Sequence, residues 1–521
     1  MKSLLKAILI LSLNSLILLG QSYPPDVAEV LNKAGNNRAE LVQVINHYSA
    51  SPKDSLKLKA AYFLIGNMGE QFYAHFIVAD SLKRDMHFNV LNYPNYTEMV
   101  RAWDSLETIY GPIENIRDNT VYDYNVITAK YLISNIDLAF EAWRKFPWAH
   151  HINFNEFCEY ILPYRGSNEP LTNWRSYFYK KYAWVADSVK DKSDPVEATV
   201  LINNDLRKWF KFDSRFYRQS TDQGLTEMLH NKMGRCEDMT NLAIYAMRAM
   251  GIPVTSDFTP YWAKTGNNHA WNAVISKTGK PIIFMGGLTN PGEYKLNQAK
   301  AKVYRKMFAK QPTSLAAQIP DYEKAPPYIN RNNIIDVTPE YGPVADVKLK
   351  LKKPKPDSVS YAYIAVFNSG EWKALNWSKI GKDKSVDYKA MGLDIAYLPV
   401  YYKNEKVIPA GEAFILTKGK ETIPLVPDLK NRTDIKLVST TRKITVNATD
   451  NIDKAFFEKG KKYTLYYWNY GWQKIGEQTA EGKPLIFNNV PSGALYWLVA
   501  ENSKKDERIF TIDKEGKQVW W

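Results

Sequence analysis

The chain has 521 residues, which is more than one ordinary hydrophobic core supports, so we expect several domains. Its formal charge of +14 comes from scattered Lys and Arg and is accompanied by no recognition motif; this argues against nucleic acid as a partner and leaves acidic polysaccharide open. Only two cysteines occur, Cys158 and Cys236, so no disulfide framework is expected, although a single bridge between them stays an open alternative.

The first 22 residues have the layout of a secretory signal peptide. Lys2 and Lys6 precede an apolar run over 7–19, and the small residues Gly20 and Ser22 follow at the two positions that a signal peptidase reads. The run is too short to count as a membrane span, and no other stretch approaches the required length. We therefore predict a secreted or periplasmic protein, with no membrane span in its mature form.

Residues 23–195 are predicted to form a helical domain. Helical apolar spacing is present over 55–65, 126–145 and 174–190, and Asp54 or Ser55 is a candidate cap for the first of these helices. A helical domain ahead of a catalytic core often restricts which substrates enter, and we expect that role here only by analogy.

A loop at 157–170 combines charged and aromatic side chains. Arg165 and Glu169 flank a turn in this loop, and Trp174 follows it closely. These residues could line a cleft and bind a substrate backbone or carboxylate, or Arg165 and Glu169 could be an internal pair that fixes the turn. We weigh the two interpretations equally, and we add Trp271, from the segment described next, to the substrate-binding candidates.

The segment 196–330 contains the candidate catalytic residues. From Met239 to Met250 the apolar residues recur every three or four positions, which predicts a helix that ends at Gly251. Gly234 supplies the turn before it, so Cys236 is expected at the helix N-terminus. The backbone N–H groups and the dipole of a helix N-terminus favour a thiolate over a thiol.

Three strands are predicted after this helix, over 252–258, 269–275 and 281–285, with a hairpin turn at 277–280. His269 begins the second strand. A helix carrying Cys236, packed on an antiparallel sheet carrying His269, would bring a thiol nucleophile to its base. The alternative for each residue taken singly is a buried cysteine or a packed histidine without chemistry.

This layout resembles the core of the transglutaminase-like superfamily, within the broader papain-like thiol enzymes. The resemblance covers about residues 200–290. It rests on Gly234 and Cys236 at a helix start, on Gly251-Ile252-Pro253 at the helix end, and on His269-Ala270-Trp271 at a strand start. It implies an α+β core in which Cys236 attacks an amide carbonyl and His269 acts as base.

The family usually has an Asp or Asn on the strand after the His strand, where it orients the imidazole. Here that strand, over 281–287, contains no carboxylate or amide. Asn272, Asp257 and Asn290 are the remaining candidates for an orienting residue. A nucleophile and base without their orienting residue can still react, because the third residue sets tautomer and geometry.

An oxyanion site is also required for this chemistry. The backbone N–H of Cys236 is the natural first donor, and Gln219 or Gln223 could supply the second as a side-chain amide. The seven histidines are dispersed, with no metal-ligand spacing, so we expect neither a metal nor another cofactor.

After the core, a basic helix is predicted over 295–310, and from residue 344 the apolar pattern has a period of two. The segment 361–372 has a counterpart in 463–472, and the Gly392–Tyr397 pair has one in Gly493–Tyr496. This repeat predicts two β-sandwich modules, over 344–430 and 431–521. Most of their aromatic residues are expected in sheet packing, and some could stack on glycan.

Together these patterns predict an α+β protein with an N-terminal helical region, a transglutaminase-like core and C-terminal β-sandwich modules. The expected activity is that of an exported thiol enzyme on a peptide, protein or glycopeptide, with hydrolysis favoured over cross-linking. The alternative is an inactive relative that binds glycan or protein through its aromatic-rich β-modules.

Overall fold

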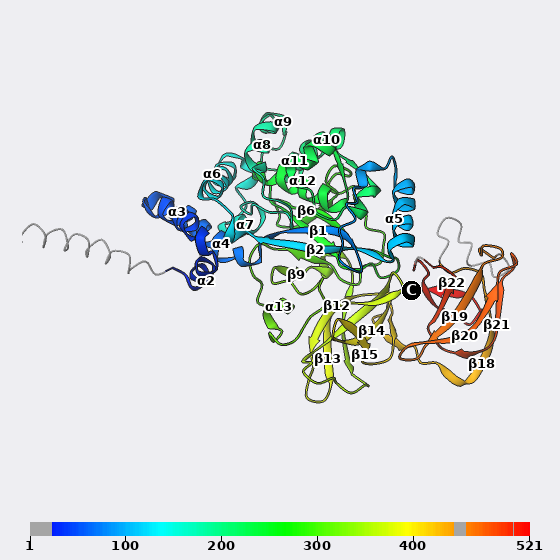
Figure 1. The fold of residues 1–521 in the computed structure, drawn as a ribbon. Helices are drawn as coiled ribbons and strands as arrows, with labels where there is room; N and C mark the ends of the chain where they lie inside the picture. Colours follow the sequence, from blue (N-terminus) through cyan, green and yellow to red (C-terminus); the bar gives the residue numbers. More distant parts are fainter. Residues whose placement is uncertain (1–22, 442–454, 504) are drawn as a thin grey trace, which may run out of the picture. The chain divides into compact units, whose positions relative to one another are not determined.

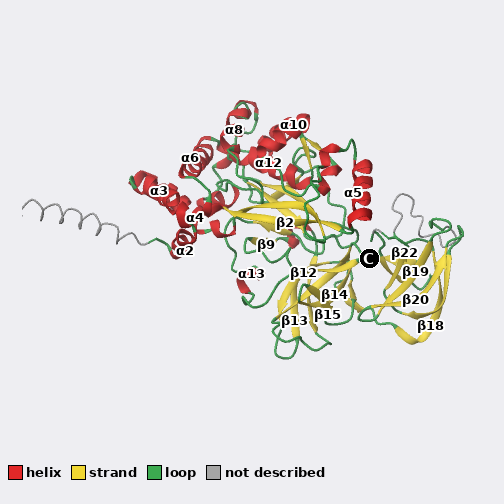
Figure 2. Ribbon diagram, viewed as in Figure 1, coloured by secondary structure: helices red, strands yellow, loops and turns green. Residues whose placement is uncertain are grey.

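The computed structural model describes residues 23–441, 455–503 and 505–521, so the predicted signal peptide lies outside the described residues. The chain divides into two compact units: unit 1 is Met1–Val254 with Ile275–Lys280, and unit 2 is Thr255–Val274 with Pro281–Trp521. Helices gather in unit 1, whereas unit 2 is built mainly from strands (Figures 1 and 2). In the described part of the chain, no helix combines the length and apolarity needed to cross a membrane.

Unit 1 contains the predicted N-terminal helices. The buried residues of α6 (Ala129–Lys145) include Leu132, Ile136, Ala139 and Phe140, the spacing of one helix face, which explains why this segment was recognisable in the sequence. The other helices of unit 1 are α2 (Pro25–Lys33), α3 (Arg38–Ser49), α4 (Ser55–Gly66), α5 (Tyr96–Tyr110), α7 (Phe154–Tyr160), α8 (Trp174–Lys181), α9 (Val185–Ser188), α10 (Pro195–Trp209), α11 (Leu225–Asn231) and α12 (Cys236–Ala249).

Two features of unit 1 differ from the prediction. A long antiparallel hairpin, β1 (Phe72–Asp80) with β2 (Ile113–Tyr122), interrupts the helical region, because β1 is rich in the aromatic and β-branched residues that favour strands. The helix predicted over 174–190 is broken into α8 and α9. Tyr182 lies between them with its side chain buried and its backbone outside helical geometry.

The predicted strands after α12 are present in a five-stranded sheet of order β7-β6-β5-β8-β9. These strands are β5 (Val254–Thr259), β6 (His269–Ile275), β7 (Pro281–Phe284), β8 (Tyr304–Lys306) and β9 (Ile334–Asp336), and a short helix, α13 (Leu315–Gln318), lies between the last two. The basic helix predicted over 295–310 is wrong. That segment is irregular apart from β8, because its residues complete the sheet: Tyr304 is buried and donates its hydroxyl to the Leu375 carbonyl at 2.7 Å.

Two sets of strands with the same order follow, which we call module 1 and module 2. Module 1 pairs β10 (Val344–Lys350) with β13 (Ser385–Gly392) and has a larger sheet of β12 (Glu371–Lys379), β11 (Tyr361–Asn368), β14 (Ile395–Lys403), β16 (Phe414–Leu416) and β17 (Thr422–Pro424), with β15 (Lys406–Pro409) beside β14. Module 2 pairs β18 (Asp428–Leu437) with β21 (Leu485–Ser492) and has a larger sheet of β20 (Trp472–Thr479), β19 (Lys462–Trp468), β22 (Tyr496–Ala500), β23 (Ile509–Ile512) and β24 (Gln518–Trp520).

A buried tyrosine marks the equivalent corner of each module. Tyr397 donates its hydroxyl to the carbonyl of Gly392 at 2.8 Å, and Tyr496 donates its hydroxyl to the carbonyl of Pro491. Both bonds span five residues. The residue equivalent to Gly392 is therefore Pro491, and the match to Gly493 suggested by the sequence was wrong.

The aromatic residues of the modules pack mainly on one another. Phe367, Trp372, Trp468, Trp472 and Trp497 form edge-to-face and tilted pairs with ring centroids 5.0–5.7 Å apart. This aromatic cluster joins β11 and β12 of module 1 to β19, β20 and β22 of module 2 inside unit 2. Most of these rings therefore serve the core, as expected.

Candidate functional site

Cys236 is the first residue of α12, as the sequence predicts, and a buried carboxylate fixes this helix start. Asp238 accepts the Arg235 backbone N–H at 2.9 Å and the Gln223 backbone N–H at 3.1 Å. A Cβ at Gly234 would lie 2.6 Å from an Asp238 oxygen, so only glycine fits there. Burial raises the pKa of Asp238 to about 6, although the Arg235 charge opposes that rise.

Charged groups surround the Cys236 thiol within unit 1. The side chain is 5 % exposed, and its S–H donates to a Glu237 carboxylate oxygen at 3.0 Å. The Arg235 guanidinium lies 3.5 Å from that same oxygen and 2.6 Å from the Asp222 carboxylate. The Glu237 carboxylate therefore favours the protonated thiol, while the Arg235 guanidinium offsets part of the negative charge beside it.

The second cysteine has a different environment. Cys158 lies on α7, where it is 3 % exposed, and burial raises the pKa of its thiol to about 12. Both cysteines belong to the described residues, and neither forms a disulfide. The bridge left open by the sequence is therefore not formed in this structure, and Cys158 has the properties of an unreactive thiol.

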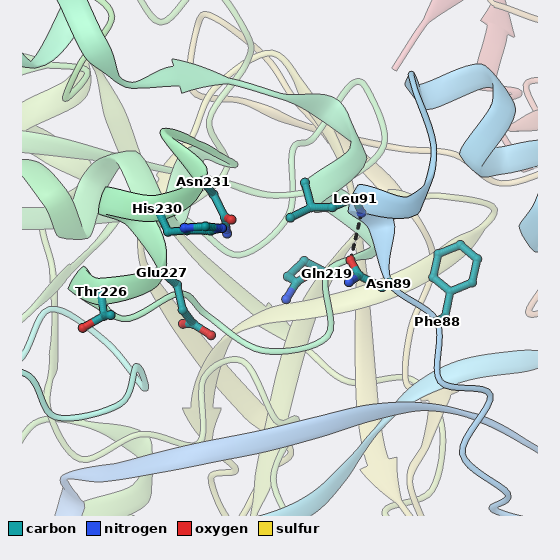
Figure 3. A pocket seen from close by; sticks show the side chains of 8 residues that line it. All are labelled: Phe88, Asn89, Leu91, Gln219, Thr226, Glu227, His230 and Asn231. Carbon is teal, nitrogen blue, oxygen red and sulfur yellow. Dashed lines mark hydrogen bonds between the residues drawn. The ribbon is translucent and has the colours of Figure 1, made fainter.

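The two glutamines considered as oxyanion donors differ in what their amides contact. Gln223 is buried, and its side-chain N–H₂ donates to the Met233 carbonyl at 3.0 Å. Gln219 lines a cavity of about 420 Å³ that also contains Glu227, His230 and other side chains (Figure 3). Side chains of residues 88–91 lie on one side of this cavity and those of α11 on the other. The Gln219 side chain thus borders a cavity, whereas the Gln223 amide is bonded to backbone.

Three of the predicted substrate-binding residues lie in the interior of unit 1. Arg165 is paired through two N–H groups with the buried carboxylate of Asp123, and it also donates to the backbone carbonyl of Glu169. The Glu169 carboxylate accepts two backbone N–H groups of its own turn, at 2.9 and 2.7 Å. Trp174 stacks on Tyr245 of α12 at 5.0 Å. These side chains fix the loop and the helix, although the ion pair joins Arg165 to Asp123 and not to Glu169, as the second interpretation of the sequence had it. We do not retain them as substrate ligands.

His269 begins β6 in unit 2, beside two indole rings whose centroids are 6.5 Å apart. Its imidazole stacks on Trp262 with centroids 6.0 Å apart and an interplanar angle of 28°, and the Trp271 ring lies 5.7 Å away. Its Nε2 is 2.6 Å from the hydroxyl of Tyr294. Tyr294 was missed in the sequence because it lies in an irregular segment 25 residues further on, where no periodicity marks it.

The residues considered for orienting His269 have other contacts. Asn272 is three residues along β6, so its side chain lies on the opposite face of the strand, where it accepts the Gly286 N–H at 3.2 Å. Asp257 on β5 accepts two N–H bonds from Arg305, at 2.9 and 2.8 Å, and the hydroxyl of Tyr341 at 2.6 Å. The Asn290 backbone N–H donates to Glu293 at 3.2 Å.

Trp271, the fourth candidate for substrate binding, is fully buried. Its indole N–H donates to the Tyr341 hydroxyl at 2.8 Å, which continues the chain of hydrogen bonds to Asp257. It therefore contributes a buried polar network and a ring beside His269. Across the described ranges, no group of three or more His, Cys, Asp and Glu side chains is arranged to hold a metal ion.

Comparison with known proteins agrees with this layout. Residues 182–282 match the family model described as the transglutaminase-like superfamily, and no curated protein is significantly similar to the chain. Among solved structures, a protein from Cytophaga hutchinsonii provisionally described as a cysteine protease is 21 % identical over 22 % of this chain and 39 % of its own, with a TM-score of 0.18. Red sea bream transglutaminase is 11 % identical over 87 % of this chain and 78 % of its own, with a TM-score of 0.21.

Both TM-scores are too low to carry a structural argument, so the assignment rests on the family model and on the resemblance noted in the sequence. The matched segment includes α12, which begins at Cys236, and β6, which begins at His269. Residues 182–282 of this chain therefore carry the core of the transglutaminase-like superfamily.

Proposed function

We propose that this protein is a thiol enzyme that cleaves amide or peptide bonds, with Cys236 as nucleophile and His269 as general base. The observation that carries the proposal is that both residues stand at the first position of their elements within the one segment that matches the transglutaminase-like core. The helix N-terminus supports Cys236, since its dipole and its backbone N–H groups favour negative charge on sulfur and can stabilise an oxyanion.

The proposed reaction has two steps. His269 takes the thiol proton as the Cys236 sulfur attacks the carbonyl carbon, and it returns that proton to the leaving amine when the C–N bond breaks. The resulting thioester is then hydrolysed by water or transferred to another amine. The backbone N–H of Cys236 is the first proposed oxyanion donor, and we retain Gln219 as the second because its side chain borders a cavity.

Tyr294 supports the role of His269 by fixing its tautomer. If Nε2–H donates to the Tyr294 oxygen, Nδ1 carries the lone pair and can accept a proton from a thiol. A hydroxyl is a weaker partner than the carboxylate usual in the family, and it adds no charge to stabilise the imidazolium. We therefore propose Tyr294, rather than Asn272 or Asp257, as the residue that orients His269.

The proposed substrate is a peptide or protein, because transglutaminase-like enzymes act on such molecules. We propose hydrolysis ahead of cross-linking, with water as the acyl acceptor, because of the resemblance to secreted thiol enzymes. A glycan remains a second class of partner. The aromatic cluster of the β-modules gives it little support, since Trp372 and Trp468 are at most 8 % exposed.

The test of the dyad is the rate of alkylation by iodoacetamide between pH 5 and 9, with the modified cysteine located by mass spectrometry. We expect Cys236 to react well below the pH range of an ordinary thiol, and His269→Ala to move its profile to higher pH. Cys158 is a control within the same chain, because burial raises the pKa of its thiol to about 12, so it should stay unlabelled over this pH range. An ordinary rate at Cys236, or a profile that His269→Ala leaves unchanged, would contradict the proposal.

Export is a separate part of the proposal. The charged start, the apolar run and the small residues Gly20 and Ser22 support cleavage near residue 22. Expression in a bacterial host followed by N-terminal sequencing of the mature protein checks this. A protein that keeps Met1 and stays in the cytoplasm would show that the segment is not a signal peptide.

A further inference from the structure

The loop that leads into His269 is a closed structure. It spans residues 260–268 between β5 and β6, and the Trp262 N–H donates to the Asn267 carbonyl at 3.1 Å. Asn267 adopts a positive φ of 64°, and a Cβ at Gly266 would lie 3.0 Å from the Ser369 hydroxyl. The ring of Trp262 stacks on the His269 imidazole. The position of this loop therefore bears directly on the orientation of His269.

Module 1 supplies the polar centre of the loop. Asn368, the last residue of β11, is 2 % exposed, and its side-chain N–H₂ lies 2.9–3.0 Å from three loop carbonyls, those of Trp262, Thr265 and Asn267. The Ser369 hydroxyl donates to the Asn368 oxygen at 3.1 Å, which fixes which way the amide faces. One amide group therefore ties together both ends of the loop.

Module 2 supplies a second restraint. Arg508, which precedes β23, is 4 % exposed and donates from one guanidinium nitrogen to the Ala263 carbonyl at 2.7 Å and to the Trp521 carbonyl at 2.9 Å. The Lys264 ammonium lies 4.8 Å from the centroid of the Trp521 ring. The loop is thus held at Ala263 and Lys264 by residues of the last strands of the chain.

We propose that Asn368 and Arg508 are positioning residues for His269, so that the β-modules hold the loop and through it set the direction of the imidazole. This inference rests on the proposed function, because it assigns the modules to the same catalytic site. Neither residue touches the imidazole, and each acts through the loop backbone. The modules then form part of the catalytic apparatus and are not separate binding domains.

The test uses the full chain with Asn368→Asp, which keeps the shape of the side chain and replaces the donor with an acceptor facing three carbonyls. The matched control is Asn376→Asp on β12. Asn376 is also buried, but its amide donates to the Lys389 carbonyl of module 1 itself, at 3.1 Å. Arg508→Met is compared with Arg432→Met at an exposed position, since Arg432 bonds only carbonyls of module 2 among its described contacts.

Two quantities are measured for each variant. Hydrogen–deuterium exchange of the peptide covering 260–268 reports on the loop, and the pH profile of Cys236 alkylation reports on the imidazole. We expect the Asn368 and Arg508 variants to exchange this peptide faster and to alkylate Cys236 about tenfold more slowly at neutral pH, because small misplacements of a catalytic group have effects of at least that size. Both controls should leave the two quantities unchanged, even where they lower the melting temperature.

The outcomes separate the two proposals. An unchanged loop in the Asn368 and Arg508 variants, or a loosened loop with an unchanged alkylation profile, would overturn the positioning role while leaving the dyad intact. Controls that slow alkylation as much as the test variants would also overturn it, because the effect would then be general destabilisation. If His269→Ala itself leaves the profile unchanged, the proposed function is wrong, whatever the Asn368 variant does.

Discussion

The segment that begins α12 and the loop that leads into β6 are fixed in different ways. Beside Cys236, Arg235 meets its carboxylate partners only 3 and 13 residues away in the sequence. Before His269, the loop is held by two residues that are distant in sequence. Asn368 lies 101–106 residues from the loop carbonyls that it bonds, and Arg508 lies 245 residues from Ala263. The segment with the nucleophile is therefore held by residues close to it in sequence. The loop before the base is held by residues more than 100 positions further along the chain.

This difference separates two kinds of vulnerability. Changes near Cys236 should act on one helix start and on its stability. Changes in the β-modules should reach His269 without touching the nucleophile. The following variants test that separation, beginning with the largest expected effect.

Removal of the Asp238 carboxylate should destabilise the protein most. Asp238→Ala leaves the buried N–H groups of Arg235 and Gln223 without their acceptor, which should lower the free energy of unfolding by about 2–4 kcal/mol. Glu227→Ala is the control: Glu227 caps α11 by the same geometry at the exposed surface, so its loss should cost about 1 kcal/mol or less. If denaturant titrations show that both variants lose the same free energy of unfolding, the burial of Asp238 does not increase its contribution to stability.

The free energy of unfolding should depend on pH because of the same Asp238 carboxyl group. Its pKa is about 6 in the folded state against 3.8 for the ordinary group, so between these values the folded protein holds a proton that the unfolded chain has lost. That contribution is present in full below pH 4 and is lost as the pH rises past 6. Relative to Asp238→Asn, the native protein should thus be about 2 kcal/mol more stable at pH 4 than at pH 7. A constant difference across this range would contradict the assignment.

Replacement of Tyr294 should change the reactivity of the His269–Cys236 pair without unfolding the protein. Tyr294→Phe removes only the hydroxyl that contacts His269 Nε2, and we expect Cys236 alkylation at neutral pH to slow by about threefold to tenfold. Tyr361→Phe is the matched control, because its hydroxyl bonds the Gln318 carbonyl at 3.2 Å, outside the loop 260–268. If the two variants behave alike, Tyr294 does not orient the imidazole.

The smallest effect should come from the half-exposed ion pair between Lys264 and Asp394. Their side chains are 25 % and 42 % exposed, so Asp394→Asn should change the free energy of unfolding by about 0.5 kcal/mol or less. The exchange of peptide 260–268 should stay close to that of the native chain. A large increase would mean that this ion pair, and not the buried amide of Asn368, secures the loop.

The elements that begin at Cys236 and His269 could be predicted from the sequence. Spacing of the apolar residues and the flanking glycines placed α12 at Cys236, and the strand pattern placed β6 at His269. The cap formed by Asp238 also had a visible signal, since it stands three residues after Arg235, the position of a capping box. The β1–β2 hairpin was missed because its residues lie among strongly helical segments.

The contacts that cross long stretches of sequence could not be predicted. Nothing local indicates that Arg165 pairs with Asp123 rather than with Glu169, or that Asn368 bonds the loop before His269. The segment around Tyr294 has no periodicity from which its place beside the imidazole could be inferred. Such contacts depend on tertiary packing, which sequence patterns constrain only weakly.

The span of 245 residues between Ala263 and Arg508 has a consequence for synthesis of the chain. A ribosome adds residues at about 5–20 per second, so Cys236 and His269 emerge many seconds before the last strands that hold the loop. If the modules position the base as we propose, an unfinished chain carries both reactive groups in an unassembled state. The order of the chain would then delay hydrolytic activity until translation is almost complete, without a separate inhibitor.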